Sequence, residues 1–240
     1  MLKKYFNKAA SSYDDNAILQ ESTGNKLFSL IRENAFSHEN IIDIGCGTGL
    51  MTKVLATHLT YHTFHALDIS ENSLSIAKKR LQPFNIQFIE SHFDTFEPNM
   101  TFDLIYSNMS LHWSENIFLT IKRLLSLLKK NGKLVFSIPM QGTFIELKPH
   151  VRVQQFVEKN TIINQFKVLH HETENIILTF PSMLTALQSI KKTGANYVSQ
   201  NFSGLQCNPF LKKLLLNPSH DSTTLTYHIG YFVLESSYVN

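Results

Sequence analysis

The chain has 240 residues, of which 43% are hydrophobic and 17% charged, a composition that excludes a disordered protein. A formal net charge of +3 is too small for a dedicated nucleic-acid binder, and no stretch is long and apolar enough to span a bilayer. The N-terminus lacks the apolar core of a secretory signal, and Cys46 and Cys207 stand in unrelated contexts. We therefore expect a cytoplasmic protein without disulfides, metal, nucleic-acid partner or membrane partner.

The first 36 residues have helical spacing, and the β-branched run Ile41–Ile44 then stops at Gly45, as a buried parallel strand does. Similar short runs alternate with helical segments further along the chain. This alternation predicts a parallel sheet with helices on both faces. The strands are expected at residues 41–44, 64–68, 86–90, 102–107 and 133–138, and the helices at 49–59, 71–81 and 115–130.

The alternation of predicted strands and helices ends after Pro139. Residues 140–173 look helical and loop-like, which is typical of a lid, and they precede a sixth strand at 176–180, a helix at 181–192 and a long seventh strand at 224–235. The sequence thus predicts a single α/β domain over residues 1–240. It consists of a Rossmann-like, seven-stranded, mostly parallel sheet, an N-terminal helical segment (1–36) and a helical lid after strand five (140–173).

A glycine-rich turn, Asp43-Ile44-Gly45-Cys46-Gly47-Thr48-Gly49, joins the first strand to the first helix. Glycines let the backbone approach a ligand closely, and in open α/β sheets ligands bind at the carboxyl ends of the strands. The turn alone is also compatible with a nicotinamide site or with a purely structural role. We expect a cofactor to contact Gly45, Cys46, Gly47 and Gly49.

Two acids favour S-adenosylmethionine as that cofactor. Asp43 stands two residues before the first glycine, where a carboxylate can hold the methionine ammonium group and would repel a pyrophosphate. Asp68, followed by Ile69, ends the second strand, where a carboxylate can accept from both ribose hydroxyls. Nicotinamide sites share the second acid, so the first one discriminates between the two cofactors, as does the long terminal strand.

The loops after the third and fourth strands complete the expected site. A residue after the third strand should contact adenine, and Asp94 is the first candidate, with His92 and Phe93 as alternatives. Ser107 and Asn108, which end the fourth strand, are also expected to bind the cofactor.

From Ser107 the sequence becomes more specific. The segment Ser107-Asn108-Met109-Ser110-Leu111-His112-Trp113 resembles the stretch after strand four in the malonyl-acyl-carrier-protein O-methyltransferases of biotin synthesis. Four other stretches are similar to that family's patterns, so the resemblance extends from about Phe6 to Glu235. They are residues 6–20, 136–147, 191–195 and 226–228. The resemblance implies the class I methyltransferase fold.

The resemblance also implies the reaction, in which S-adenosylmethionine methylates the free carboxylate of a malonyl group. The malonyl group would be carried by acyl carrier protein or by coenzyme A, and its methyl ester would prime pimeloyl synthesis for biotin. A carboxylate with a pKa of about 4 is already ionised at neutral pH, so no general base is required. Tyr13, His112 and Arg152 are candidates for orienting the substrate. Some of the basic residues after strand five should dock the acidic carrier: Lys148, Arg152, Lys159, Lys167, Lys191 and Lys192.

Two departures from the family pattern stand out: His92 replaces an acid, and Gln155 occupies the position of a lid arginine. Three rival functions share the cofactor site. One is a small-molecule or quinone methyltransferase of the same fold, and another is a non-enzymatic cofactor-binding subunit. The third, an RNA or protein methyltransferase, is disfavoured because the fourth strand is not followed by an N/D-P-P-Y-type tetrapeptide.

Overall fold

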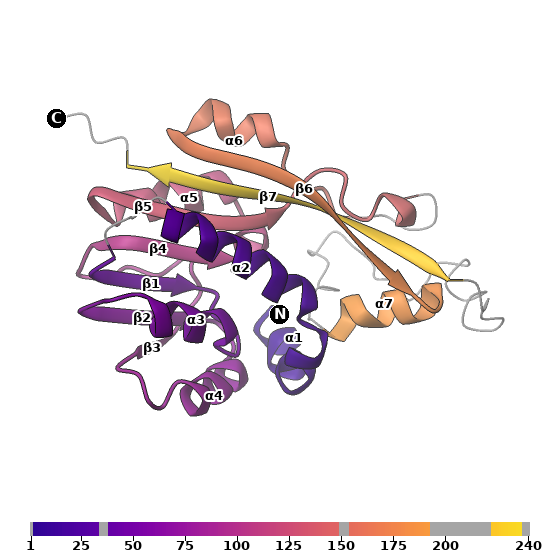
Figure 1. Ribbon diagram of the computed structural model, residues 1–240, viewed down its shortest axis with the longest axis horizontal. Helices are drawn as coiled ribbons and strands as arrows, with labels where there is room; N and C mark the ends of the chain where they lie inside the picture. Colours follow the sequence, from indigo (N-terminus) through magenta and orange to yellow (C-terminus); the bar gives the residue numbers. More distant parts are fainter. Residues whose placement is uncertain (1, 34–37, 149–153, 193–221, 237–240) are drawn as a thin grey trace.

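A computed structural model describes residues 2–33, 38–148, 154–192 and 222–236 of the chain (Figure 1). The described strands form one seven-stranded sheet in the order β3-β2-β1-β4-β5-β7-β6. β1 to β5 run parallel, and β7 is antiparallel to both of its neighbours, which confirms the predicted mostly parallel sheet. The strands are β1 (Asn40–Ile44), β2 (Thr63–Asp68), β3 (Gln87–Glu90), β4 (Phe102–Asn108), β5 (Leu128–Pro139), β6 (Val168–Phe180) and β7 (Thr223–Glu235).

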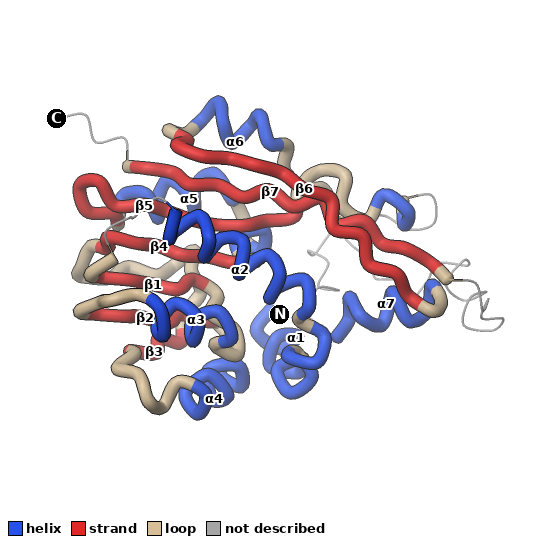
Figure 2. The backbone as a smooth tube through the Cα atoms, in the orientation of Figure 1, coloured by secondary structure: helices blue, strands red, loops and turns tan. Residues whose placement is uncertain are grey.

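Helices cover both faces of the sheet, as expected (Figure 2). On one face, Leu27, Leu55 and Ala186 belong to the cluster that packs α2, α3 and α7 against the strands. On the other face, Ile121 and Ile162 join α5 and α6 to a second cluster. The helices are α1 (Leu2–Ala9), α2 (Ile18–Glu33), α3 (Leu50–His58), α4 (Glu71–Arg80), α5 (Ile117–Ser126), α6 (Lys159–Gln165) and α7 (Met183–Lys192).

Local sequence accounts for several element boundaries. Ile41, Ile42 and Ile44 are completely buried because β1 has helices on both faces. Ser70 caps α4, where its hydroxyl accepts from the Ser73 backbone N–H at 3.1 Å, as the sequence predicts. Asn116 caps α5 by accepting from the backbone N–H groups of Phe118 and Leu119, the second and third residues of the helix.

The predicted helix over residues 115–130 is too long at its C-terminal end. α5 ends at Ser126, and β5 begins at Leu128, which pairs with Phe102 of β4. The Asn131-Gly132 pair, which directly follows the predicted helix, lies inside β5, where the register with β4 shifts. Asn131 has a φ of 66°, so the pair forms an irregularity in the strand instead of a helix cap.

β6 begins at Val168, eight residues before the predicted strand. Its first half pairs with Leu234–Gly230 of β7 and alternates between exposed and partly buried side chains. That alternation is weak in sequence because the segment contains polar residues on both faces, as expected for a strand at the sheet edge. The segment between β5 and β6 therefore ends at Lys167 instead of residue 173.

The far end of the β6–β7 pair extends past the carboxyl end of β5. Pro139 is the last β5 residue in the ladder, opposite Ile229, whereas Thr223–His228 pair in the ladder with β6. A short 3-10 turn (Ile145–Leu147) lies against this extension, because Glu146 accepts from the Thr226 backbone N–H at 3.1 Å and from its hydroxyl at 2.5 Å. Figure 1 shows this extension and the N-terminal helix α1 at the same edge, where the parallel strands end. None of the helices among the described residues could cross a membrane.

Candidate active site

The glycine turn after β1 has the tight geometry that its sequence predicts. Gly45 and Gly47 have φ values of +73° and +56°, in the region that favours glycine. A Cβ on Gly45 would lie 2.4 Å from the Ser110 Cβ, so this position admits no side chain. A Cβ on Gly47 would meet only the Tyr13 ring, at 3.9 Å. The Tyr13 ring therefore lies over the turn, and the backbone beneath it is open to a ligand.

Asp68 joins this turn to the loop after β2. One carboxylate oxygen accepts from the Gly47 backbone N–H at 2.8 Å, and the other accepts from the Ser70 backbone N–H at 2.7 Å. Burial raises the pKa of Asp68, while these N–H groups and that of Ile69 lower it. Each carboxylate oxygen has a further lone pair, so Asp68 can still accept from vicinal hydroxyls of a bound ribose.

Asp43 is a buried acid at the end of β1, with 2% of its surface exposed. The Thr52 hydroxyl of α3 donates to its carboxylate at 2.6 Å. Burial raises the pKa of Asp43 to about 7; the Thr52 hydrogen bond opposes this shift and the nearby Asp68 charge adds to it. A bound cation would favour the ionised carboxylate here. Sequence reasoning did not identify Thr52, because only the fold places the first turns of α3 beside β1.

A pocket opens beside these groups, and we call it the acidic pocket. Among its described lining residues are the carboxylates of Glu21 and Asp43, and none is a lysine, arginine or histidine. An acidic pocket of this kind favours a positively charged ligand. Its lining residues are Tyr13, Gln20, Glu21, Asp43, Gly45, Cys46, Thr48, Leu50, Met51, Tyr106 and Asn108.

Polar contacts hold the N-terminal segment over the pocket. Asp14 pairs with Arg80 of α4 and accepts from the Thr48 hydroxyl at 2.6 Å. Asn7 accepts from the Ser70 hydroxyl at 2.7 Å. These bonds place Tyr13 above the turn, and its phenol stays protonated because burial and the surrounding carboxylates raise its pKa. The sequence indicated Tyr13 but gave no sign of this clamp, whose partners are distant along the chain.

Ser107 and Asn108 lie at the end of β4, where both are engaged within the protein. The buried Ser107 hydroxyl donates to the Ile44 carbonyl at 2.9 Å, which supports the end of β1. Asn108 donates to the Gln20 carbonyl at 2.7 Å and accepts from the hydroxyls of Thr23 and Ser137 at 2.9 and 2.7 Å. Asn108 therefore fixes α2 to the sheet beside the pocket.

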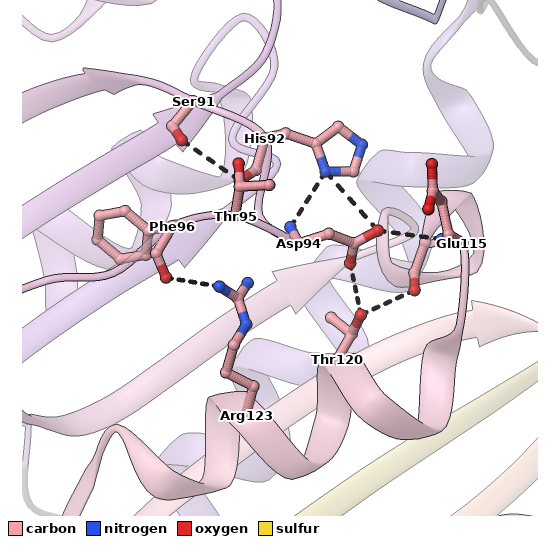
Figure 3. Close-up of polar contacts among 9 residues, drawn as sticks. Ser91, His92, Asp94, Thr95, Phe96, Glu115, Thr120 and Arg123 are labelled. Atoms are coloured by element: carbon pink, nitrogen blue, oxygen red, sulfur yellow. Dashed lines mark hydrogen bonds and ion pairs between the residues drawn. The ribbon is translucent and has the colours of Figure 1, made fainter.

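The expected adenine contacts lie in the loop after β3 (Figure 3). The Asp94 carboxylate accepts from the Glu115 backbone N–H at 3.0 Å and from the Thr120 hydroxyl at 2.5 Å, so it secures the start of α5. The Asp94 backbone N–H donates to His92 Nδ1 at 3.1 Å, which leaves the proton of a neutral His92 ring on Nε2. The Phe93 side chain is buried in the core. Of the three candidates, His92 is the one whose side chain offers an N–H donor, at Nε2 of the neutral ring.

His112 stands in the 3-10 turn Leu111–Trp113 after β4. Its ring packs 4.7 Å from Trp113 and 6.2 Å from Phe156, between ring centroids. Burial lowers the pKa of His112 to about 3, so the ring is neutral at physiological pH. Its buried Nδ1 has no hydrogen-bond partner among the described residues. Arg152 lies outside the described residues. Among the described residues, no three histidine, cysteine or acidic side chains are placed to hold a metal ion.

Comparisons with known proteins identify the family of the chain. The family model described as a methyltransferase domain matches residues 41–132, from β1 into β5. The malonyl-[acyl-carrier protein] O-methyltransferase 2 of Coxiella burnetii is 36% identical over 242 residues, which cover 97% of this chain and 94% of that protein. The malonyl-[acyl-carrier protein] O-methyltransferase of Buchnera aphidicola is 33% identical over 224 residues, which cover 88% of this chain and 87% of that protein.

A solved structure shows the same fold at low identity. The N-methyltransferase NodS from Bradyrhizobium japonicum, in complex with S-adenosyl-L-homocysteine, superposes with a TM-score of 0.60 and 16% identity, over 97% of this chain and 98% of that one. At this identity the likeness supports the class I methyltransferase fold that the sequence predicts.

The pKa of Asp43 makes a prediction about stability. Its folded-state pKa of about 7 lies above the ordinary value of 3.8, so the folded state retains a proton that the unfolded state loses between those values. The stabilising contribution is complete below pH 4 and is lost as the pH rises through 7. Urea denaturation of the ligand-free protein should show wild type losing roughly 2–3 kcal/mol relative to Asp43→Asn between pH 5 and 8. The exposed Asp15→Asn variant is the control, and a pH-independent difference for Asp43→Asn would contradict the buried-acid interpretation.

Proposed function

The chain belongs to the malonyl-acyl-carrier-protein O-methyltransferase family, and from this premise we propose that it methylates the free carboxylate of a malonyl thioester, with S-adenosylmethionine as the methyl donor. The lining of the acidic pocket supports this proposal independently of sequence similarity. The acidic pocket joins the glycine turn to Asp43, Tyr13 and the end of β4, and its described lining offers carboxylates and neutral groups to a cationic donor. The product, a malonyl methyl ester, would serve as a primer for biotin synthesis.

The residues at the carboxyl edge fit the donor. Asp68 has acceptor capacity for a ribose, and Asp43 is a buried acid in reach of an ammonium group that enters the acidic pocket. His92 Nε2 is our proposed side-chain contact to the adenine edge, in place of Asp94, whose carboxylate is engaged by α5. When bound, S-adenosylmethionine supplies a methyl group on a positively charged sulfur.

The chemistry requires little proton transfer from this chain. The S–CH₃ bond breaks as the O–CH₃ bond forms, so the sulfonium charge and the carboxylate charge neutralise one another and no proton moves. His112 is a poor base because burial lowers its pKa, and Tyr13 is unavailable as a base because its raised pKa keeps the phenol protonated. Their proposed role is to orient the carboxylate and to exclude water, and orientation alone can lower a barrier by roughly 7–11 kcal/mol.

The malonyl group arrives on a carrier, for which acyl carrier protein is our proposal and coenzyme A is the alternative. Lys167 cannot contribute to a docking surface at the pocket. It pairs at 2.6 Å with Glu235, which lies opposite Lys133 in the first half of β5, far from the carboxyl ends of the parallel strands. Lys148, which follows the 3-10 turn beside the β6–β7 extension, lies at the correct edge. We place the reaction in the cytoplasm, where a free thiol such as Cys46 stays reduced.

The substrate assignment predicts a sharp preference. Malonyl-acyl carrier protein should gain ~14 Da, the mass of one CH₂. The acetyl thioester should remain unmodified because it has no free carboxylate to accept the methyl group. Intact-protein mass spectrometry with the unlabelled donor measures this directly. Equal turnover of both thioesters, or methylation of a quinone or an RNA instead, would contradict the assignment and leave the fold unaffected.

Asp68 should matter for donor affinity. Asp68→Ala removes a charged acceptor from the ribose and a support from the turn, so binding should weaken by about 1.5–3 kcal/mol. Calorimetry on folded protein measures the loss, and the exposed Glu97→Ala variant, in the loop after β3, should bind normally. Unchanged affinity in Asp68→Ala would show that the ribose is held elsewhere.

A further inference from the structure

We propose that Gln20 is a specificity-determining residue: its side-chain oxygen accepts from the α-ammonium group of the methyl donor, and the acidic pocket selects the donor by its positive charges instead of its carboxylate. This inference rests on the proposed function, because it takes S-adenosylmethionine as the donor. It starts from an unsatisfied group. Gln20 Oε1 is buried at the acidic pocket and has no hydrogen-bond partner among the residues that the structure describes.

The backbone of Gln20 is held firmly, so the position of its side chain is not accidental. Its carbonyl accepts from Asn108 Nδ2 at 2.7 Å. One turn further along α2, the Gly24 carbonyl accepts from the Tyr106 hydroxyl at 3.3 Å. A Cβ on Gly24 would lie 2.4 Å from Met51 Cγ, so α2 packs closely on α3. These contacts fix the helix that presents Gln20 to the pocket.

A buried acceptor without a partner carries a desolvation penalty that a ligand donor removes. The donor molecule offers one strong hydrogen-bond donor at its amino-acid end, the α-ammonium group. Asp43 is buried at the same pocket, so the ammonium group can lie between a carboxylate and the Gln20 amide oxygen. A charge-assisted bond to a neutral amide adds attraction without placing a further carboxylate there.

The pocket offers the donor's own carboxylate much less. Its described lining contains Glu21 and Asp43 and no cationic side chain. Because this lining offers the α-carboxylate no cationic partner, that group is best accommodated toward solvent, where water can satisfy it. A donor that lacks this carboxylate should therefore lose little affinity, whereas loss of the contact to the ammonium group should be costly.

Calorimetric titration of the full chain tests this with two ligands, S-adenosylmethionine and its decarboxylated form, which retains the amine. Wild type should bind the two with Kd values within about fivefold of one another. Gln20→Ala should weaken both by roughly ten- to hundredfold, which is the range for loss of a hydrogen bond to a charged group. Gln20→Glu should favour the decarboxylated ligand by at least about tenfold, because the new acid attracts the amine and repels the carboxylate.

Asn25→Ala is the matched control, since it removes an exposed amide from the same helix and should leave both Kd values unchanged. Circular dichroism and thermal unfolding establish that each variant is folded. If Gln20→Ala weakens only S-adenosylmethionine, Gln20 contacts the carboxylate and the inference is overturned. If neither Kd changes, Gln20 makes no contact and the inference fails while the proposed function stands. A wild-type protein that binds neither ligand would overturn both.

Discussion

The Asp68 carboxylate, shared between the backbone N–H groups of Gly47 and Ser70, is the interaction on which the rest of the site depends. It joins the turn after β1 to the loop after β2 and holds the glycine backbone open. Thr48, in the same turn, donates to Asp14, and this bond helps to hold Tyr13 over Gly47. One side chain at a strand end thus organises two loops and the segment that covers them.

The site concentrates carboxyl groups where water is scarce. Burial raises the pKa of both Asp43 and Asp68, so ionised carboxylates are disfavoured until a cation arrives. A methyl donor that carries a sulfonium and an ammonium group supplies this positive charge and favours the ionised form of both carboxylates. His112 is also suited to a cationic donor. Burial lowers its pKa to about 3, so the ring is neutral and does not repel the positive charge.

Features written in local sequence were predictable. The buried run Ile41–Ile44, the glycine turn and the acids Asp43 and Asp68 follow from short patterns, and the structure brings them to one edge. Features set by tertiary contacts were not. Leu128 pairs with Phe102 and so shortens the predicted helix, and the Asp94 carboxylate is engaged by α5. Gln20 was visible in sequence only as part of a pattern, because its unpartnered oxygen follows from burial.

This chain should catalyse methyl transfer through charge and orientation, without a general base. The pH dependence of the single-turnover rate, with both substrates saturating, tests it most directly. We predict a rate that is constant within about twofold from pH 6.5 to 9, because the malonyl carboxylate is ionised throughout and His112 is neutral throughout. A rate that rises about tenfold per pH unit to a plateau, and loses that slope in His112→Phe, would contradict it.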